Sequence, residues 1–207
     1  MSVILECKNI NFSYPDKKVL DSFNCRVEEG ERVCLLGESG CGKTSLLRLL
    51  AGLERPESGE VFLRGRVVAN QNIFVPASKR NIGYVFQSFA LFEKVSVEKN
   101  IYYGCKTREH KEEAKKLIQL MKLGDHLTKY PSQLSGGEKQ KVALARSLAL
   151  KPDIIFMDEP FSSIDPEQTK FLIKEIKELF KKLEVTALMV THSREESELF
   201  ADRIINF

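Results

Sequence analysis

Eight consecutive residues have the types and spacing that bind phosphate. Glycines stand at the first, fourth and sixth positions, followed by a lysine and a threonine. The glycines let the backbone turn tightly and direct its N–H groups at an anion, and the lysine adds a full positive charge. The threonine hydroxyl is suited to bind Mg²⁺. This loop and the serine after it are predicted to bind nucleotide: Gly37, Glu38, Ser39, Gly40, Cys41, Gly42, Lys43, Thr44 and Ser45.

The segments on either side give this loop the context that phosphate binding needs. Residues 32–36 form a short apolar run typical of a buried strand. Residues 45–51 favour a helix, which Gly52 ends. The helix N-terminus carries partial positive charge, which favours an anion at the loop. The order strand, loop, helix therefore favours nucleotide binding over an ordinary glycine-rich turn.

Two adjacent carboxylates end a second apolar run. Residues 154–157 are wholly apolar and lead into Asp158 and Glu159. Carboxylates at the end of a buried strand are costly unless they have a partner. Because side chains alternate along a strand, we expect the two carboxylates to point differently, one toward Mg²⁺ and the other toward an attacking water.

Two further apolar runs end in polar residues. Residues 82–86 lead into Gln87, and residues 185–190 lead into Thr191 and His192. In a parallel sheet His192 would share one edge with the phosphate loop and with Asp158 and Glu159, where ligand sites collect. A single histidine at a strand end is otherwise usually structural. Ser193–Glu196 then predicts a capping box for a short final helix.

The segment Ser135–Glu138 also has a capping-box pattern, with two glycines inside it. Glycine in the first turn of a helix costs up to ~1 kcal/mol relative to alanine. A cap alone does not need that cost. We expect instead that an anion approaches the bare backbone closely, which makes Ser135, Gly136 and Gly137 candidate nucleotide-binding residues.

Two aromatic features leave alternatives open. Tyr14 precedes the phosphate loop, where an aromatic ring could stack on a nucleotide base or simply belong to the turn at residues 14–17. The apolar segment 88–92 reads as core or as a surface that docks a partner, and core is the favoured interpretation. Residues 114–121 predict one apolar face of a lysine-rich helix that stops at Gly124.

Composition narrows the class of protein. The chain has 207 residues, 43% of them hydrophobic, and a net charge of +3, so it suits one domain and offers no basic surface for nucleic acid. Its apolar runs are shorter than the ~20 residues of a membrane-spanning helix. The first six residues show no secretion signal. The five scattered cysteines favour neither a disulfide framework nor a zinc site, which fits a reducing cytosol.

Over essentially its whole length the chain resembles the ATP-binding subunits of ABC transporters. Leu134–Glu138 is similar to the signature motif of that family and is the most specific match. Ser163 and Ile164 depart mildly from the family pattern, which often has alanine and leucine in the D-loop. The other matching segments are Gly37–Thr44 (Walker A), Ile154–Glu159 (Walker B), Gln87 (Q-loop), His192 (switch histidine), Ser162–Asp165 (D-loop) and Tyr14 (base-stacking aromatic).

The resemblance implies an α/β fold. It consists of a P-loop NTPase core with a mostly parallel sheet, an N-terminal antiparallel β lobe and an inserted α-helical subdomain. Residues 1–207 would form a single ABC-type ATPase domain. The core and lobe would occupy residues 1–86 and 151–207, and the helical subdomain residues 87–150.

The resemblance also implies the cofactors, ATP and Mg²⁺, and a role for each site residue. Lys43 and the loop amides hold the phosphates, while Thr44, Asp158 and Gln87 belong to the metal site. Glu159 is the general base, His192 steadies the γ-phosphate and the water, and Gln87 senses the site and links it to the permease. These three residues form the catalytic set.

By the same resemblance the active form is a homodimer. Its two copies sandwich two ATPs, and the loop of one copy faces Ser135–Gly137 of the other. The dimer would act with integral membrane permease subunits, and indirectly with a substrate-binding protein. It would lie at the cytoplasmic face of the inner (plasma) membrane.

Within the family, residues 76–87 and 100–104 look most like importers of inorganic ions such as molybdate or tungstate, sulfate or ferric iron. Two alternatives stay open: an export or lipoprotein-release ATPase, and a non-transport ABC ATPase that acts on nucleic acid or ribosomes. Such importers often carry a regulatory domain after the core. The sequence leaves open whether that domain is naturally absent after Phe207.

Overall fold

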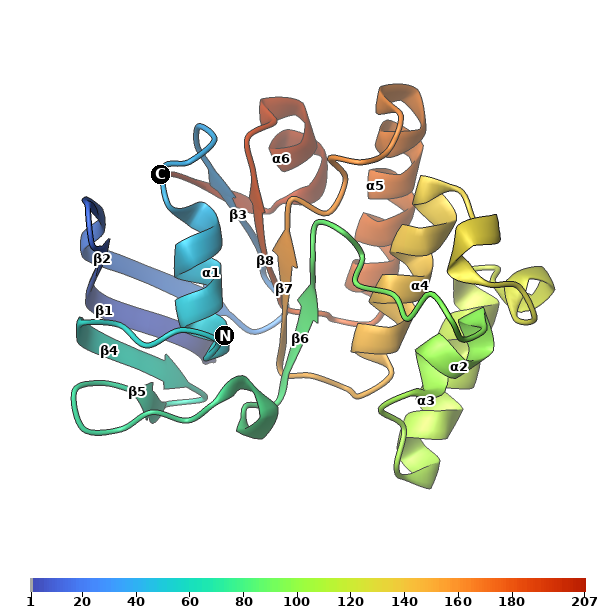
Figure 1. Cartoon of the computed structure of the whole chain (residues 1–207), viewed down its shortest axis with the longest axis horizontal. Coiled ribbons are helices and arrows are strands. Elements are labelled where there is room, and N and C mark those ends of the chain that lie inside the picture. The colour runs from blue at the N-terminus through green and yellow to red at the C-terminus, as the bar shows by residue number, and fades with distance from the viewer. Residues whose placement is uncertain (1) are drawn as a thin grey trace.

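The computed structural model describes residues 2–207, which form two β-sheets with one helix between them and further helices beyond the second sheet (Figure 1). The first sheet is antiparallel and has the order β2-β1-β4-β5. Its strands are β1 (Val3–Tyr14), β2 (Lys17–Glu28), β4 (Ser58–Leu63) and β5 (Arg66–Ala69). The long hairpin of β1 and β2 turns at Pro15 and Asp16, as the turn residues predict.

The second sheet is wholly parallel and has the order β6-β7-β8-β3-β9. Most of its side chains are apolar because helices or the other sheet cover both of its faces. Its strands are β3 (Arg32–Leu36), β6 (Ile82–Val85), β7 (Ile154–Asp158), β8 (Ala187–Thr191) and β9 (Arg203–Asn206).

The helices divide between the two faces of this parallel sheet (Figure 1). One face packs against α1, and the other packs against α4, α5 and α6. Helices α2 and α3 in turn pack against α4. The helices are α1 (Lys43–Ala51), α2 (Val97–Tyr102), α3 (Arg108–Leu120), α4 (Gly136–Leu148), α5 (Pro166–Lys182) and α6 (Arg194–Phe200). Within residues 2–207, single 3₁₀ turns also lie at Ala77–Lys79, Gly124–His126 and Pro131–Gln133.

Strand alternation divides the core into two clusters. In β7, Ile155 and Met157 face the helical side, whereas Ile154 and Phe156 face α1 and the antiparallel sheet. Strand β8 divides its side chains in the same way. Because successive side chains of a strand point to opposite faces, one apolar strand contributes to both core clusters. The predicted fold class, a mostly parallel core with an antiparallel lobe and added helices, is confirmed.

Local signals predicted the helix ends with mixed success. Gly52 is left-handed and ends α1, and Asp165 caps α5 as predicted. Helix α3 ends at Leu120 rather than near Gly124, because Met121 leaves the helical conformation. The capping box predicted at Ser193 is half wrong: Ser193 caps α6, but the carboxylate of Glu196 accepts a hydrogen bond from Thr191 instead.

The helical part lies on one side of the molecule. Helices α2, α3 and α4 form it, and Ala114, Leu117 and Ile118 are the buried face of α3. The boundaries proposed for this part, residues 87 and 150, remain a prediction. None of the helices within residues 2–207 combines the length and the apolar character that crossing a bilayer requires.

Candidate functional site

One edge of the parallel sheet collects most of the predicted site residues. Asp158 ends β7, Gln87 and His192 follow β6 and β8 closely, and the glycine loop follows β3. These four strands are parallel, so their carboxyl ends lie at the same edge. The expectation that a parallel sheet would bring His192 to the edge of the glycine loop and the two carboxylates is therefore met, and Gln87 lies at the same edge.

The glycine loop is closed around its own lysine. The Lys43 ammonium donates to the carbonyl oxygens of Gly37 and Glu38, at 2.7 Å each, and is 4% exposed. Its nitrogen lies 3.7 Å from the Cys41 sulfur. Gly40 and Gly42 have φ angles of 76° and 115°, a region that favours glycine. This backbone holds a buried positive charge at the loop, where a bound phosphate would replace the two carbonyl oxygens as its partner.

The β1–β2 hairpin supports this loop from outside. The Lys17 ammonium donates to the carbonyl oxygen of Gly40 at 2.9 Å. A Cβ at Gly42 would overlap the side chain of Val19, so glycine is needed there for packing as well as for φ. Sequence reasoning missed Lys17 and Val19, because no local pattern indicates which loop a hairpin will touch.

Tyr14 lies at the end of β1, close to the start of α1. Its hydroxyl is 3.2 Å from the Ser45 hydroxyl and 3.4 Å from the Glu54 carboxylate, and its ring packs edge-on against Phe12. Nearly half of the side chain remains exposed. The tyrosine is therefore beside the predicted nucleotide loop, and base stacking on it stays a prediction.

The carboxylate of Asp158 joins three elements. One oxygen accepts a hydrogen bond from the Thr44 hydroxyl of α1 at 2.8 Å, and the other accepts from the Tyr84 hydroxyl of β6 at 3.2 Å. Asp158 is 8% exposed. Burial raises its pKa above the ordinary value, and the bonds from Thr44 and Tyr84 oppose that rise. Sequence reasoning named Thr44 and Asp158 but not Tyr84.

Glu159 points to a different partner from Asp158, as expected, although it lies just after β7 and not within the strand. Its carboxylate lies 3.4 Å from Nδ1 of His192, which follows β8. The backbone of Glu159 has φ 42°, in the left-handed region, and its N–H donates to the carbonyl of Val190. A non-glycine residue held in this region stores strain, and such strain gathers at functional sites. The bend directs Glu159 to the edge where His192 lies.

Ser135, Gly136 and Gly137 lie apart from the glycine loop of the same chain. They open α4, on the opposite side of β6 and β7 from α1 (Figure 1). The predicted capping box is present: the Glu138 amide donates to the Ser135 hydroxyl, and the Ser135 amide donates to the Glu138 carboxylate at 2.7 Å.

The structure adds a second reason for one of the two glycines. A Cβ on Gly136 would lie 3.1 Å from the carbonyl oxygen of Ser163 and 3.3 Å from the Ile164 side chain, so the D-loop of the same chain favours glycine there. A Cβ on Gly137 would make one ordinary contact, with Leu172 at 3.8 Å. Packing within this chain therefore does not require Gly137, and an approaching anion remains the predicted reason for it.

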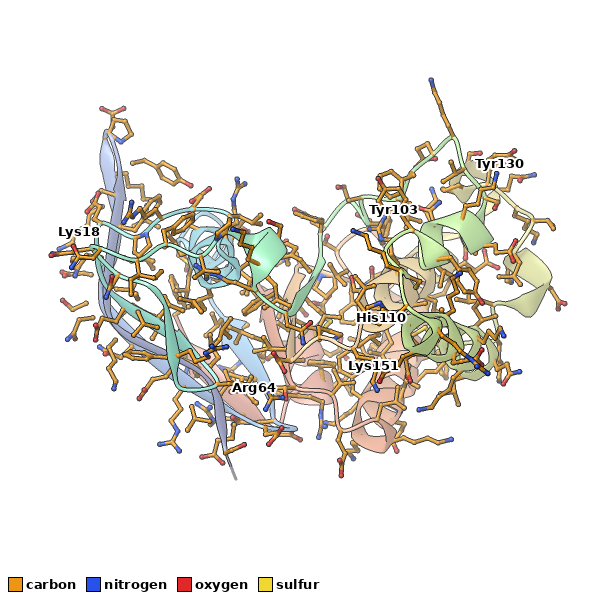
Figure 2. All side chains as sticks on the ribbon, turned by 90° about the horizontal axis from the view of Figure 1, so that it is seen from below. Lys18, Arg64, Tyr103, His110, Tyr130 and Lys151 are labelled. Atoms are coloured by element: carbon orange, nitrogen blue, oxygen red, sulfur yellow. The ribbon has the colours of Figure 1, made fainter. Side chains whose placement is uncertain are left out.

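Gln87 is exposed and begins a segment that mixes core and surface. Phe89 and Leu91 are half-buried against the helical core, which agrees with the favoured interpretation. Phe92 is exposed, and its ring stacks on Tyr103 at 4.3 Å between centroids. The core interpretation is thus wrong for Phe92. Figure 2 shows Tyr103 on the helical side of the molecule, at the opposite end from Lys18 of the hairpin.

The residues at this edge fit a nucleotide with its metal. Hydroxyl and carboxylate oxygens are the ligands that Mg²⁺ prefers, and Thr44 and Asp158 present them side by side at the loop. The glycine conformations and the buried Lys43 fit a polyphosphate. The donor set therefore suits Mg²⁺ with ATP.

Comparison with known proteins agrees with this geometry. Residues 20–162, more than half of the chain, match the family model described as ABC transporter. The chain belongs to the ABC transporter family. One relative of this ABC transporter chain is the sulfate/thiosulfate import ATP-binding protein CysA of Synechococcus elongatus, 41% identical over 99% of the chain and 60% of the relative.

Another is the spermidine/putrescine import ATP-binding protein PotA of Spiroplasma citri, 42% identical over 98% of the chain and 58% of the relative. This ABC transporter chain therefore spans about three fifths of the length of these curated relatives. A solved dimeric ATP-binding cassette, in a post-hydrolysis state bound to ADP and Pi, is 27% identical to it. The match has a TM-score of 0.80 and covers 99% of this chain and 94% of that one.

Proposed function

We propose that this chain binds and hydrolyses ATP with Mg²⁺ and powers an ABC-type importer. The contact that carries the proposal is the 2.8 Å bond from Thr44 to Asp158, beside a glycine loop that holds the buried ammonium of Lys43. This bond places a hydroxyl and a carboxylate that can bind a metal directly beside a phosphate-binding loop. Membership of the ABC transporter family supports the same activity.

Each residue at the sheet edge has a task in this proposal. Lys43 and the loop amides bind the phosphates, and Thr44 and Asp158 would hold Mg²⁺. When bound, Mg²⁺ would supply positive charge beside the phosphate that is transferred. Gln87, at the start of an exposed segment, contacts the metal or the γ-phosphate and reports its presence to the permease.

Hydrolysis then requires a positioned water. A carboxylate oxygen of Glu159 accepts the proton as the water oxygen bonds to the γ-phosphorus. The bond from that phosphorus to the β–γ bridging oxygen breaks, and the oxygen keeps the electron pair, so ADP and phosphate leave. His192, 3.4 Å from Glu159, orients this carboxylate and donates to the γ-phosphate.

The nucleotide site is shared between two copies of the chain. The signature residues Ser135–Gly137 lie apart from the glycine loop within one chain, so a second copy must supply them. Gly137 has no packing partner in its own chain that requires glycine. A homodimer with two ATPs at its interface explains both the separation of these segments and the glycine at position 137. The dimeric relative bound to ADP and Pi supports this arrangement.

The partners follow from the importer role. The dimer binds integral membrane permease subunits at the cytoplasmic face of the membrane and acts indirectly with a substrate-binding protein. Both relatives carry import names, which supports import over export. The sulfate relative supports the inorganic-ion prediction, whereas the polyamine relative has a different cargo. To decide between these cargoes, the binding protein that co-purifies with the transporter is tested for binding of radiolabelled sulfate and of radiolabelled spermidine.

The activity is tested on the purified chain. ATP binding is measured by calorimetry and phosphate release by a colorimetric assay, with Mg²⁺ and with EDTA. We expect Mg²⁺-dependent turnover that Lys43→Ala abolishes, because the buried ammonium holds the phosphates. Lys182→Ala, at the far end of α5, is the matched control and should keep normal turnover. Absence of ATP binding by the folded native chain would refute the proposal.

A further inference from the structure

Tyr84 holds the second oxygen of the metal-site carboxylate. Its hydroxyl donates to Oδ2 of Asp158 at 3.2 Å, while Thr44 donates to Oδ1 at 2.8 Å. Each oxygen of this nearly buried carboxylate thus has its own hydroxyl donor. A carboxylate held at both oxygens loses its freedom to rotate, so its orientation is set before a metal arrives.

The register of the sheet explains why Tyr84 reaches Asp158. In the pairing of β6 with β7, Tyr84 lies opposite Phe156. Residues two apart on a strand share a face, so Asp158 lies on the same face as Phe156. That face is the one that packs against α1, which carries Thr44. Tyrosine is long enough to reach forward along this face to the carboxylate.

The backbone and ring of Tyr84 are held in place as well. Its carbonyl accepts a hydrogen bond from Ser147 of α4 at 3.2 Å, and its ring packs on Phe86 at 4.4 Å and toward Phe156 at 6.5 Å. The hydroxyl is therefore delivered by a rigid strand rather than by a mobile loop. The same strand leads, three residues later, to Gln87.

We propose that Tyr84 is a positioning residue for the metal site, which sets the orientation of Asp158 and connects it to the strand that leads into Gln87. The inference rests on the proposed Mg²⁺-ATP function. It assigns to Tyr84 no contact with the nucleotide or the metal. A packing role alone would need only the ring, whereas the positioning role needs the hydroxyl.

The test separates these roles with Tyr84→Phe, which keeps the ring and removes the hydroxyl. Mn²⁺, standing in for Mg²⁺, is titrated into the protein with a saturating non-hydrolysable ATP analogue, and free Mn²⁺ is followed by electron paramagnetic resonance. Affinity for the analogue alone is measured in EDTA. Tyr102→Phe, in α2 of the helical part, is the matched control. Tyr84→Met is a second variant without the hydroxyl.

We expect Tyr84→Phe and Tyr84→Met to weaken Mn²⁺ binding about tenfold, which is the size of effect seen when a residue that hydrogen-bonds to a metal ligand is replaced. Affinity for the ATP analogue in EDTA should stay within about twofold of the native value. Tyr102→Phe should match the native protein. Unchanged Mn²⁺ affinity in folded Tyr84→Phe overturns the inference, as does an equal loss with and without metal. A native protein that binds the analogue but no Mn²⁺ overturns the proposed function itself.

Discussion

The carboxylate of Glu159 and the imidazole of His192 lie 3.4 Å apart although 32 residues separate them in the chain. Strands β7 and β8 are neighbours in the sheet, and each residue comes just after the end of its strand. Adjacent parallel strands thus bring a potential base and its orienting group together, as expected from the two apolar runs that lead into these residues.

Replacing Glu159 with glutamine should separate binding from hydrolysis. Glu159→Gln keeps the shape but removes the group that accepts the proton from water. We expect ATP binding near the native level and turnover lower by about 10²-fold or more. Binding is measured by calorimetry and turnover by phosphate release. Near-native turnover would remove Glu159 from the role of general base.

Mixing two defective chains should restore one working site. Lys43→Ala spoils a glycine loop, and Ser135→Arg blocks a signature segment. If the two act in trans, a mixed dimer has one site with both defects and one with neither, whereas each mutant alone has two damaged sites. ATP-dependent dimerisation, followed by light scattering, should therefore exceed that of either mutant. Folded mutants that gain nothing on mixing would argue for sites contained within one chain.

Arg80 should be essential for stability although it lies outside the active site. Its guanidinium, 5% exposed, donates to four carbonyl oxygens, two of them at the C-terminal end of α1. Burial lowers its pKa to about 10, so the group stays charged at neutral pH. Arg80→Met removes all four bonds: the carbonyls of Leu49 and Val68 keep backbone donors in the N–H groups of Gly52 and Val75, whereas the carbonyls of Leu50 and Val75 lose the guanidinium as their donor. We expect a loss of roughly 3 kcal/mol in the free energy of unfolding.

Urea unfolding followed by circular dichroism measures this loss. Arg66→Met is the matched control, because Arg66 is exposed and should change stability by less than about 0.5 kcal/mol. Equal stability of the two variants would show that the Arg80 contacts contribute little.

The exposed pair Phe92 and Tyr103 should matter for the permease rather than for ATP chemistry. Tyr103 is 70% exposed, and its ring stacks on Phe92. We expect Tyr103→Ser to reduce co-purification with the permease while basal ATP hydrolysis stays near normal. Phe171→Ser, another exposed aromatic on α5, should affect neither. An equal effect of both substitutions would leave the docking role of Tyr103 without support.

Contacts close in sequence could be predicted from the sequence. The glycine loop, the caps at Ser135 and Asp165 and the apolar strands depend on residues within a few positions of one another, where residue type and spacing determine the conformation. The segment Ser193–Glu196 is an exception. It has the residue types of a capping box, but the carboxylate of Glu196 accepts a hydrogen bond from the Thr191 hydroxyl instead.

Tertiary structure decided the contacts between distant segments. Lys17 on Gly40, Tyr84 on Asp158 and the D-loop against Gly136 depend on strand order, register and helix placement. A lysine, a tyrosine or a glycine in these segments has many possible partners, and local spacing does not choose among them. The choice is made when the two sheets and their helices pack together, because only then do the side chains on each face acquire fixed neighbours.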